Sequence, residues 1–181
     1  IIIVIHENSH PIVEVLCMKS IIKTDRLELK TPELYMAHEV FNLITQNREY
    51  FNNYLPWVKS ISTINDIETM IDGYINAFIN KSEYRYYIFC KKRDKIIGSI
   101  TIRNINLIAR QAELGFWLDY SETGNGYIIE AYNALDVERI KIDKIVANTF
   151  SYNLKSMKTL KRLGFHVIKT KENINQFIKL I

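Results

Sequence analysis

The segment that decides the fold of this chain runs from residue 117 to residue 131. It reads Trp117-Leu118-Asp119-Tyr120-Ser121-Glu122-Thr123-Gly124-Asn125-Gly126-Tyr127-Ile128-Ile129-Glu130-Ala131. An alternating strand ends here, a polar loop with two glycines follows, and a helical segment begins directly after it. The unpaired N–H groups of a first helical turn attract anions, and glycine lets the backbone approach a phosphate closely. The segment therefore predicts an anion site, although Asn-Gly alone is also a common hairpin turn.

The composition is that of one globular domain. The chain has 181 residues, of which 48% are hydrophobic and 24% charged, enough for a core of its own. Its net charge of +4 comes from scattered lysines, without the basic stripe and interleaved aromatics of a nucleic-acid binder. No apolar run approaches the roughly 20 residues of a membrane span. Cys17 and Cys90 give neither a disulfide framework nor a metal spacing. We expect a cytoplasmic protein without a bound metal, a membrane segment or a nucleic-acid partner.

The first 17 residues differ from the rest of the chain because they contain no lysine or arginine. Met18 is the first candidate initiator, and it leads directly into strand-like sequence at residues 26–29. We therefore expect residues 1–17 to be an N-terminal extension and residues 18–181 to form a single domain.

Hydrophobic periodicity predicts an α/β domain with a mixed sheet. A helix is expected from Thr31-Pro32, with Thr31 as its N-cap, and further helices are expected from about residue 64, after the glycine loop, and from Asn153 to the C′ residue Gly164. Strands are expected at residues 26–29, 84–91, 95–103, 111–118 and 144–150, with one or two more in residues 166–181. Short links between the three middle strands favour an antiparallel meander.

Six short motifs follow one another along residues 20–170. They are Thr24-Asp25-Arg26-Leu27-Glu28-Leu29, Asn47-Arg48-Glu49 with Leu55-Pro56-Trp57-Val58, Ile96-Ile97-Gly98, Ala112-Glu113-Leu114-Gly115-Phe116-Trp117-Leu118, Gly124-Asn125-Gly126-Tyr127 with Glu130-Ala131, and Asn153-Leu154-Lys155-Ser156 ending in Leu163-Gly164-Phe165. In this order they resemble the GNAT superfamily of acetyl-CoA-dependent N-acetyltransferases, and more closely its RimJ/RimL-type branch, which acetylates N-terminal amines of ribosomal proteins. The resemblance implies a GNAT fold, a mixed and mostly antiparallel central sheet flanked by about four helices.

The resemblance also implies where acetyl-CoA binds. The backbone of the glycine loop would wrap the pyrophosphate, through Gly124, Asn125, Gly126 and Tyr127. The pantetheine arm would pair with the free edge of the strand at residues 111–118, where that strand and the next one splay apart. The residues implied for the arm are Trp117, Leu118, Asn153 and Ser156. Asn153 is equally suited to be a plain N-cap, and Ser121 replaces the glutamine or arginine of the family's loop pattern.

The reaction implied is the direct attack of a neutral amine on a thioester, which needs a proton acceptor and oxyanion stabilisation. By resemblance, the N–H of Leu118 stabilises the oxyanion and Ser156 gives a proton to the leaving thiolate. Glu113 would order a water chain to the amine. The alternative for Glu113 is a solvated or salt-bridged strand residue, and the alternative for Ser156 is a polar residue that merely fills a helix position. Leu160 occupies the place of the family's proton-donating tyrosine, and Ile168 lies near the place of a branch glutamate.

The acceptor pocket is implied to lie beside the region between the first two helices. Asn47, Arg48, Tyr54 and Trp57 match that region, and loop packing is the alternative for them. The tail after Gly164 looks shorter than in the branch, as does the stretch between residue 131 and residue 145. We expect the pocket to be open at that side, or completed by a partner subunit, in a monomer or a homodimer.

Together these features predict an N-acetyltransferase that uses acetyl-CoA as co-substrate. The acceptor expected is a primary amine, most simply the N-terminal amine of a protein or peptide of the ribosomal-protein type. Two alternatives stay open at this point: an acetyltransferase for small-molecule amines, and a non-catalytic protein that binds acetyl-CoA.

Overall fold

The computed structural model describes residues 18–181, so the expected extension at residues 1–17 and Cys17 lie outside the described residues. The eight strands of the described part are β1 (Ile21–Lys23), β2 (Leu27–Lys30), β3 (Tyr84–Cys90), β4 (Lys95–Asn106), β5 (Gln111–Leu118), β6 (Lys144–Phe150), β7 (His166–Lys171) and β8 (Ile174–Leu180). Its α-helices are α1 (Ala37–Gln46), α2 (Arg48–Asn52), α3 (Ile64–Ile79), α4 (Tyr127–Ala134) and α5 (Leu154–Arg162). The α/β class and the meander of β3, β4 and β5 are confirmed.

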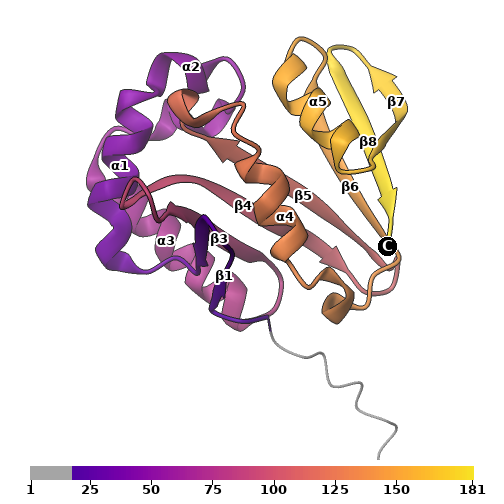
Figure 1. Ribbon diagram of the computed structural model, residues 1–181, viewed down its shortest axis with the longest axis horizontal. Coiled ribbons are helices and arrows are strands. Elements are labelled where there is room, and N and C mark those ends of the chain that lie inside the picture. Colours follow the sequence, from indigo (N-terminus) through magenta and orange to yellow (C-terminus); the bar gives the residue numbers. More distant parts are fainter. Residues whose placement is uncertain (1–17) are drawn as a thin grey trace, which may run out of the picture.

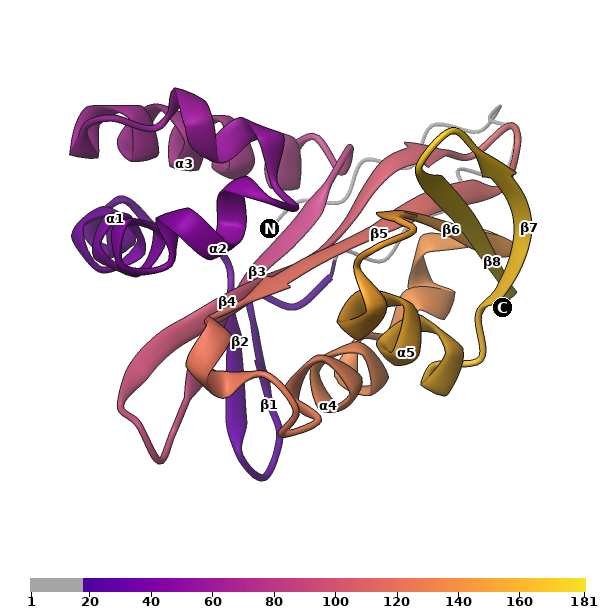
Figure 2. The same ribbon diagram turned by 90° about the horizontal axis from the view of Figure 1, so that it is seen from above.

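All eight strands form one sheet, in the order β1-β2-β3-β4-β5-β6-β8-β7. Helices α1, α2 and α3 cover one face of the sheet, and α4 and α5 cover the other (Figures 1 and 2). Two apolar cores result, one under each layer of helices. The alternation of β5 supplies both, because Leu114 faces the core of α4 and α5 whereas Trp117 packs against Phe51 of α2, with 5.4 Å between ring centroids.

The pairing of β5 with β6 is the irregular feature that makes room for a site. It is the one parallel contact among the described strands, and it extends only from the pair Gln111 and Lys144 to the pair Glu113 and Val146. Beyond Glu113 the two strands separate, which confirms the splay implied by the resemblance. The sheet is therefore split between a β1–β5 part and a β6–β8 part (Figure 1).

One expectation about local structure needs correction. Thr31 is not an N-cap: its N–H donates to the carbonyl of Ser20 at 3.0 Å, so sheet pairing takes the group that a helix start would leave free. The chain instead forms a 3-10 turn from Leu34 before α1 begins at Ala37. The expectation of one or two strands in residues 166–181 is confirmed, since β7 and β8 form a hairpin and β8 pairs with the whole of β6.

Other local expectations are confirmed. Helix α3 begins at Ile64 behind a capping box, in which Thr63 and Asp66 exchange side-chain and backbone hydrogen bonds. Asn153 caps α5, and Gly164 follows that helix with a φ of +85°. Helix α2 is an addition to the four helices expected. None of the helices within residues 18–181 combines the length and the apolar character needed to cross a membrane.

Candidate active site

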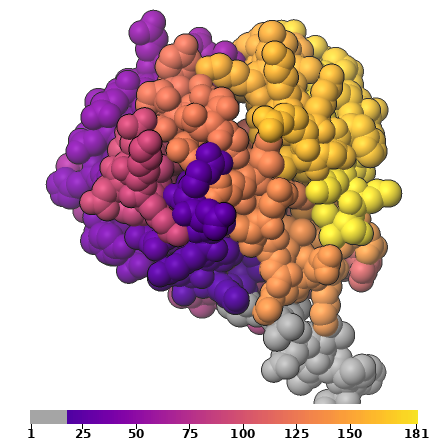
Figure 3. Space-filling view, in the orientation of Figure 1, coloured from indigo at the N-terminus to yellow at the C-terminus, as the bar shows by residue number. Residues whose placement is uncertain are grey.

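A cleft of about 680 Å³ opens where β5 and β6 separate. The space-filling view shows the surface hollowed between the part built by α4 with its preceding loop and the part built by α5 (Figure 3). The cleft is lined by Tyr50, Phe51, Tyr54, Leu55, Phe116, Trp117, Leu118, Thr123, Gly124, Gly126, Tyr127, Ile128, Ile129, Asn148, Thr149, Phe150, Asn153, Lys155, Ser156, Lys158, Thr159, Arg162 and Ile174. It thus brings together most of the residues implied for acetyl-CoA.

The glycine loop forms one lip of the cleft. Gly124 and Gly126 have φ angles of +89° and +79°, a region that costs other L-residues about 1–2 kcal/mol. Gly126 is the N-cap of α4 and has no side chain, so no cap occupies the N–H groups of the first turn. Those donors and the positive end of the α4 dipole are left for a ligand. The loop therefore has the form of an anion site.

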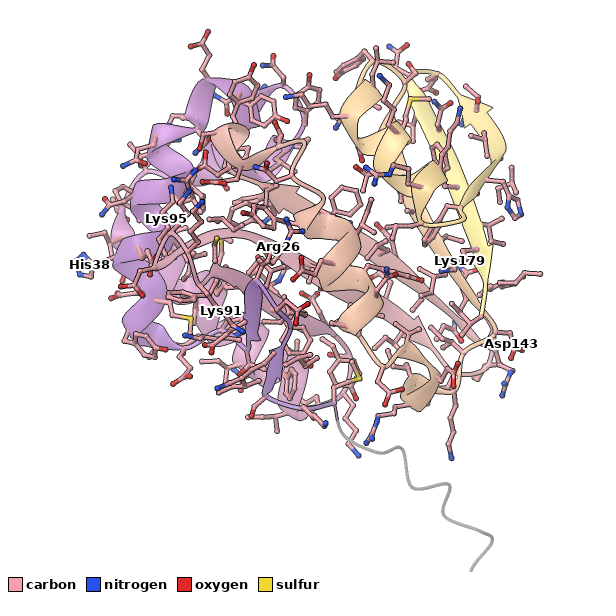
Figure 4. All side chains as sticks on the ribbon, viewed as in Figure 1. Arg26, His38, Lys91, Lys95, Asp143 and Lys179 are labelled. Carbon is pink, nitrogen blue, oxygen red and sulfur yellow. The ribbon has the colours of Figure 1, made fainter. Side chains whose placement is uncertain are left out.

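An ion-pair cluster holds this loop from behind. Arg26 donates from Nε to Oε2 of Glu130 at 2.6 Å and from Nη1 to the carbonyl of Asn125 at 3.1 Å. Thr24 Oγ1 donates to Oε1 of Glu130 at 2.5 Å, and the Arg26 guanidinium lies 4.6 Å from the ring centroid of Tyr127. Figure 4 shows Arg26 beside α4. The start of the domain thereby fixes the loop and the first turn of α4.

Hydrogen bonds to the carboxylates of Glu130 and Asp119, near the glycine loop, lower the pKa values of both groups. Burial by itself would raise the pKa of Glu130, but hydrogen bonds from Thr24 and Arg26 outweigh it and hold that pKa below its usual value. The pKa of Asp119 is also lowered, because hydrogen bonds from Ser121 and Lys95 outweigh the effect of burial. Both groups are therefore anionic near neutral pH, and both point their charge at fixed partners rather than into the cleft.

The end of β5 offers backbone groups to the cleft. The Asp119 N–H donates to the carbonyl of Ile97 at 2.7 Å, and the Trp117 carbonyl lies only 2.3 Å from where a Cβ on Gly98 would stand, so both groups face β4. Because residues of an antiparallel pair alternate between bonding their partner and turning away from it, the N–H of Leu118 faces the free edge. Leu118 is thus the residue whose backbone is turned to the cleft, while Trp117 lines it without presenting its carbonyl.

Helix α5 forms the opposite wall. The Asn153 side chain accepts a hydrogen bond from the N–H of Ser156 at 3.2 Å, so the N-cap role holds while both residues also line the cleft. Leu160 is only 1% exposed and belongs to the core, so its position does not face the site. The side chains of Lys155, Lys158 and Arg162 line the cleft along one face of α5. This wall is basic.

A chain of aromatic rings spans the mouth of the cleft. The rings follow in the order Tyr120, Tyr50, Tyr54, Tyr152 and Phe150. The distances between the centroids of successive rings are 4.9, 5.3, 6.0 and 5.0 Å. The Tyr152 hydroxyl also donates to the carbonyl of Asn53 at 3.2 Å. The two parts of the sheet are joined here by side chains, which gives the α2 end of the cleft an aromatic wall.

Several residues expected in the site lie elsewhere. Both carboxylate oxygens of Glu113 are engaged, by Arg103 at 2.6 Å and by Asn104 at 2.9 Å, and Glu113 does not line the cleft. Asn47 ties α1 to the turn after β5, since it accepts from the N–H of Tyr120 at 2.9 Å. Arg48 donates to the carbonyl of Val58, and Trp57 packs near Trp117. Of the four residues expected at the acceptor pocket, only Tyr54 lines the cleft.

A family model described as the acetyltransferase (GNAT) domain matches residues 26–166, which include the loop, both cleft walls and the splayed strands. This chain belongs to the GNAT acetyltransferase family. The match and the fold confirm the family expected from the six motifs. Within residues 18–181 no group of three or more His, Cys, Asp or Glu residues is placed to hold a metal ion.

Known acetyltransferases resemble the chain in sequence and structure. The ribosomal-protein-serine acetyltransferase of Escherichia coli (strain K12) is 28% identical over 112 residues, which span only 62% of each chain. The probable N-acetyltransferase YjcK of Bacillus subtilis (strain 168) is 27% identical over 80% of this chain and 83% of its own. A structure of RimL, the ribosomal L7/L12 alpha-N-protein acetyltransferase, in complex with coenzyme A superposes with a TM-score of 0.82 at 21% identity, covering 89% of this chain and 98% of that one.

A second solved structure has the same fold. The microcin C7 self-immunity acetyltransferase MccE, in complex with acetyl-CoA and AMP, superposes with a TM-score of 0.80 at 24% identity, over 87% of this chain and 94% of its own. At these identities the likeness is one of fold.

Sequence reasoning missed several residues of this GNAT site. Arg26 and Lys155 lie within the matched motifs, but nothing in those motifs signalled that Arg26 anchors the loop or that Lys155 enters the cleft. Tyr50 and Tyr152 carry no local signal, because their partners are distant in sequence. Figure 4 shows His38 projecting from the outer side of α1, away from the cleft.

Proposed function

We propose that this GNAT protein transfers the acetyl group of acetyl-CoA to the N-terminal amine of a protein or peptide, of the ribosomal-protein type. One observation carries the proposal: the glycine loop, and the start of α4 that no side chain caps, border a cleft between the separated strands β5 and β6. The family match and the similarity to ribosomal-protein-serine acetyltransferase support it.

The charge of the cleft fits a polyanionic co-substrate. Among the described residues that line it there is no aspartate or glutamate, whereas Lys155, Lys158 and Arg162 project into it from α5. The N–H groups at the start of α4 add partial positive charge next to the loop. Gly124, Gly126 and Tyr127 would hold the pyrophosphate, with Asn125 fixed behind them by Arg26. The net charge of +4 favours the approach of such an anion.

The proposed reaction is a direct transfer. The amine nitrogen attacks the thioester carbon, the N–H of Leu118 donates to the developing oxyanion, and the carbon–sulfur bond then breaks. The Ser156 hydroxyl gives its proton to the departing thiolate, and the surplus proton of the amine returns to Ser156 through water, so that the hydroxyl is restored. Asn153 holds Ser156 in place through the start of α5. Glu113 has no part in this scheme, because its carboxylate is engaged elsewhere.

The absence of a base among the described cleft residues favours acceptors of low pKa. No histidine, aspartate or glutamate in this part of the chain lines the cleft, so the amine must reach it neutral or lose its proton to water. An α-amino group has a pKa of about 7.7–8.0, so roughly a third of it is neutral at pH 7.5. A lysine amine, with a pKa of about 10.4, is neutral in roughly one molecule in a thousand. The cleft therefore suits an N-terminal amine.

The test combines binding with turnover. Acetyl-CoA and coenzyme A, but not ATP, should raise the thermal midpoint, because a ligand bound only to the native state stabilises it. Release of free thiol is then followed with peptides that have a free N-terminus, with the same peptides N-acetylated but carrying a lysine, and with spermidine. We expect release only with free N-termini. Release with spermidine alone would indicate a small-molecule acetyltransferase, and binding without any release would indicate a non-catalytic protein.

A further inference from the structure

We propose that Lys155 is the side chain that binds the pyrophosphate of acetyl-CoA across the cleft from the glycine loop. The inference rests on the proposed function and names a residue that the loop itself does not contain. Lys155 lies on the first turn of α5, and its Nζ donates to Thr123 Oγ1 at 2.9 Å, directly before Gly124. The ammonium is therefore already at the loop.

The other cations near the loop are already neutralised. Arg26 pairs with Glu130 at 2.6 Å, Arg93 with Glu122 at 3.0 Å and Lys95 with Asp119 at 3.2 Å. Within the described residues Lys155 has no carboxylate partner; its contacts are a hydroxyl and the rings of Tyr120 and Tyr50, whose centroids lie 4.2 Å and 5.7 Å from Nζ. Lys155 thus brings an uncompensated charge to the anion site.

The position of Lys155 is unfavourable without an anion. A cation in the first turn of a helix lies at the positive end of the dipole, and α5 has no acidic residue in that turn to offset it. A phosphate at the loop would relieve this repulsion and would replace a neutral hydroxyl acceptor with a charged one, which makes a stronger hydrogen bond. The contact with Thr123 is therefore the ligand-free position of a side chain that moves to the phosphate.

The loop has no nearer side chain for this purpose. The hydroxyl of Ser121 donates to Oδ1 of Asp119 at 2.9 Å, and the amide of Asn125 donates to the carbonyl of Glu122 at 3.2 Å. Lys158 and Arg162 lie one and two turns further along α5 and also face the cleft, so they suit the more distant 3′-phosphate. The assignment of the pyrophosphate to Lys155, and of the 3′-phosphate to Lys158 and Arg162, can be tested with separate ligands.

Isothermal titration calorimetry with three probes tests the assignment: coenzyme A, dephospho-coenzyme A, which lacks the 3′-phosphate, and pantetheine, which lacks the pyrophosphate together with the 3′-phosphate and adenosine beyond it. Lys155→Met should weaken binding of the first two by the same factor, about tenfold, and should leave pantetheine unchanged. Lys155→Arg should keep most of the affinity because it keeps the charge. Lys161→Met is the matched control, since Lys161 is an exposed lysine of the same helix that does not line the cleft.

Each other outcome overturns the assignment in a recognisable way. Equal affinity of Lys155→Met and wild type means that Lys155 binds no phosphate. A loss confined to coenzyme A assigns Lys155 to the 3′-phosphate, and a loss that includes pantetheine assigns it to the shape of the cleft. Wild type that binds none of the probes refutes the proposed function itself, and the role of Lys155 with it.

Discussion

The two ends of the cleft are built in different ways. At the loop end, the positions of Gly124, Gly126 and Tyr127 are fixed by backbone conformation and by an ion-pair cluster centred on Arg26 and Glu130. At the α2 end, aromatic rings meet across the mouth, and few polar bonds hold them. A rigid end suits a ligand that is always the same, and an adaptable aromatic end suits the part of a substrate that varies.

The largest effect is expected from Gly124→Glu, which should break the loop end alone. No atom lies within 4 Å of the added Cβ, so the variant should fold, at a cost of about 1–2 kcal/mol for its left-handed φ. The added bulk and negative charge should lower acetyl-CoA affinity by about a hundredfold, or about 2.7 kcal/mol. Calorimetry measures the loss. Gly164→Glu shares the left-handed φ outside the cleft and should bind normally; equal losses would place the effect in folding.

Gly98→Ala, a substitution on β4, should distort the neighbouring strand β5, which lies between the loop end and the α2 end of the cleft. Its Cβ would stand 2.3 Å from the Trp117 carbonyl and 2.9 Å from Leu118 Cδ1, so β5 must shift where Leu118 faces the cleft. Overpacking of this kind costs about 1–3 kcal/mol. Urea unfolding measures the cost, with Gly73→Ala as the control: that helical position has open space and should gain about 0.5–1 kcal/mol. Unchanged stability of Gly98→Ala would mean that the strands part easily.

Arg26→Met should loosen the loop while leaving the aromatic end intact. It removes the bonds to Glu130 and to the Asn125 carbonyl, and it should cost about 1 kcal/mol after allowance for the partly exposed guanidinium. Affinity for coenzyme A should fall several-fold as the loop loses its support. Arg110→Met is the control, because the exposed Arg110–Asp143 pair lies outside the cleft and should change neither quantity. Equal behaviour of both variants would refute the anchoring role.

The loop end should also be the acid-sensitive end. Because the pKa of Glu130 is lower in the folded protein, the stability that it contributes is complete above its unfolded pKa of about 4.3. That contribution is lost as the pH falls through the folded pKa. Urea midpoints of wild type and Glu130→Gln, measured from pH 7 to pH 3, should therefore converge at the acid end. A constant difference between the two across that range would contradict the mechanism.

The smallest effect is expected from Tyr152→Phe, which tests how loosely the α2 end is held. The substitution removes the hydrogen bond to Asn53 and keeps the ring contacts, at a cost of about 0.5–1 kcal/mol. Coenzyme A affinity should stay the same, and the KM for a peptide acceptor should change two- to threefold. A large loss of coenzyme A affinity would show that the two ends are coupled.

The sequence predicts the loop end better than the aromatic end for a physical reason. The strand, the two glycines and the helix start are neighbours in the chain, so alternation and backbone conformation reveal them. Glu130 and Arg26 are 104 residues apart, and their pairing depends on how the sheet assembles. Tertiary pairing also overrides local signals, as when the Thr31 N–H joins the sheet instead of a helix. Glu113 has the right chemistry for catalysis, but Arg103 on the neighbouring strand takes its charge.

Side-chain contacts across the mouth of the cleft connect its two walls, so that the opening is bounded by a ring of residues. Three contacts cross the mouth: the hydrogen bonds from Tyr152 to Asn53 and from Lys155 to Thr123, and the cation–π contact of Lys155 with the Tyr120 ring. Each contributes a net stabilisation of about 1 kcal/mol or less. Two of these three contacts belong to Lys155, so its movement to a phosphate would release the loop side of the ring while the Tyr152 contact stays in place. A long, flexible ligand can pass through the ring end-on, whereas sideways entry requires these contacts to break. The ring thereby favours end-on entry and exit of a ligand over sideways exchange.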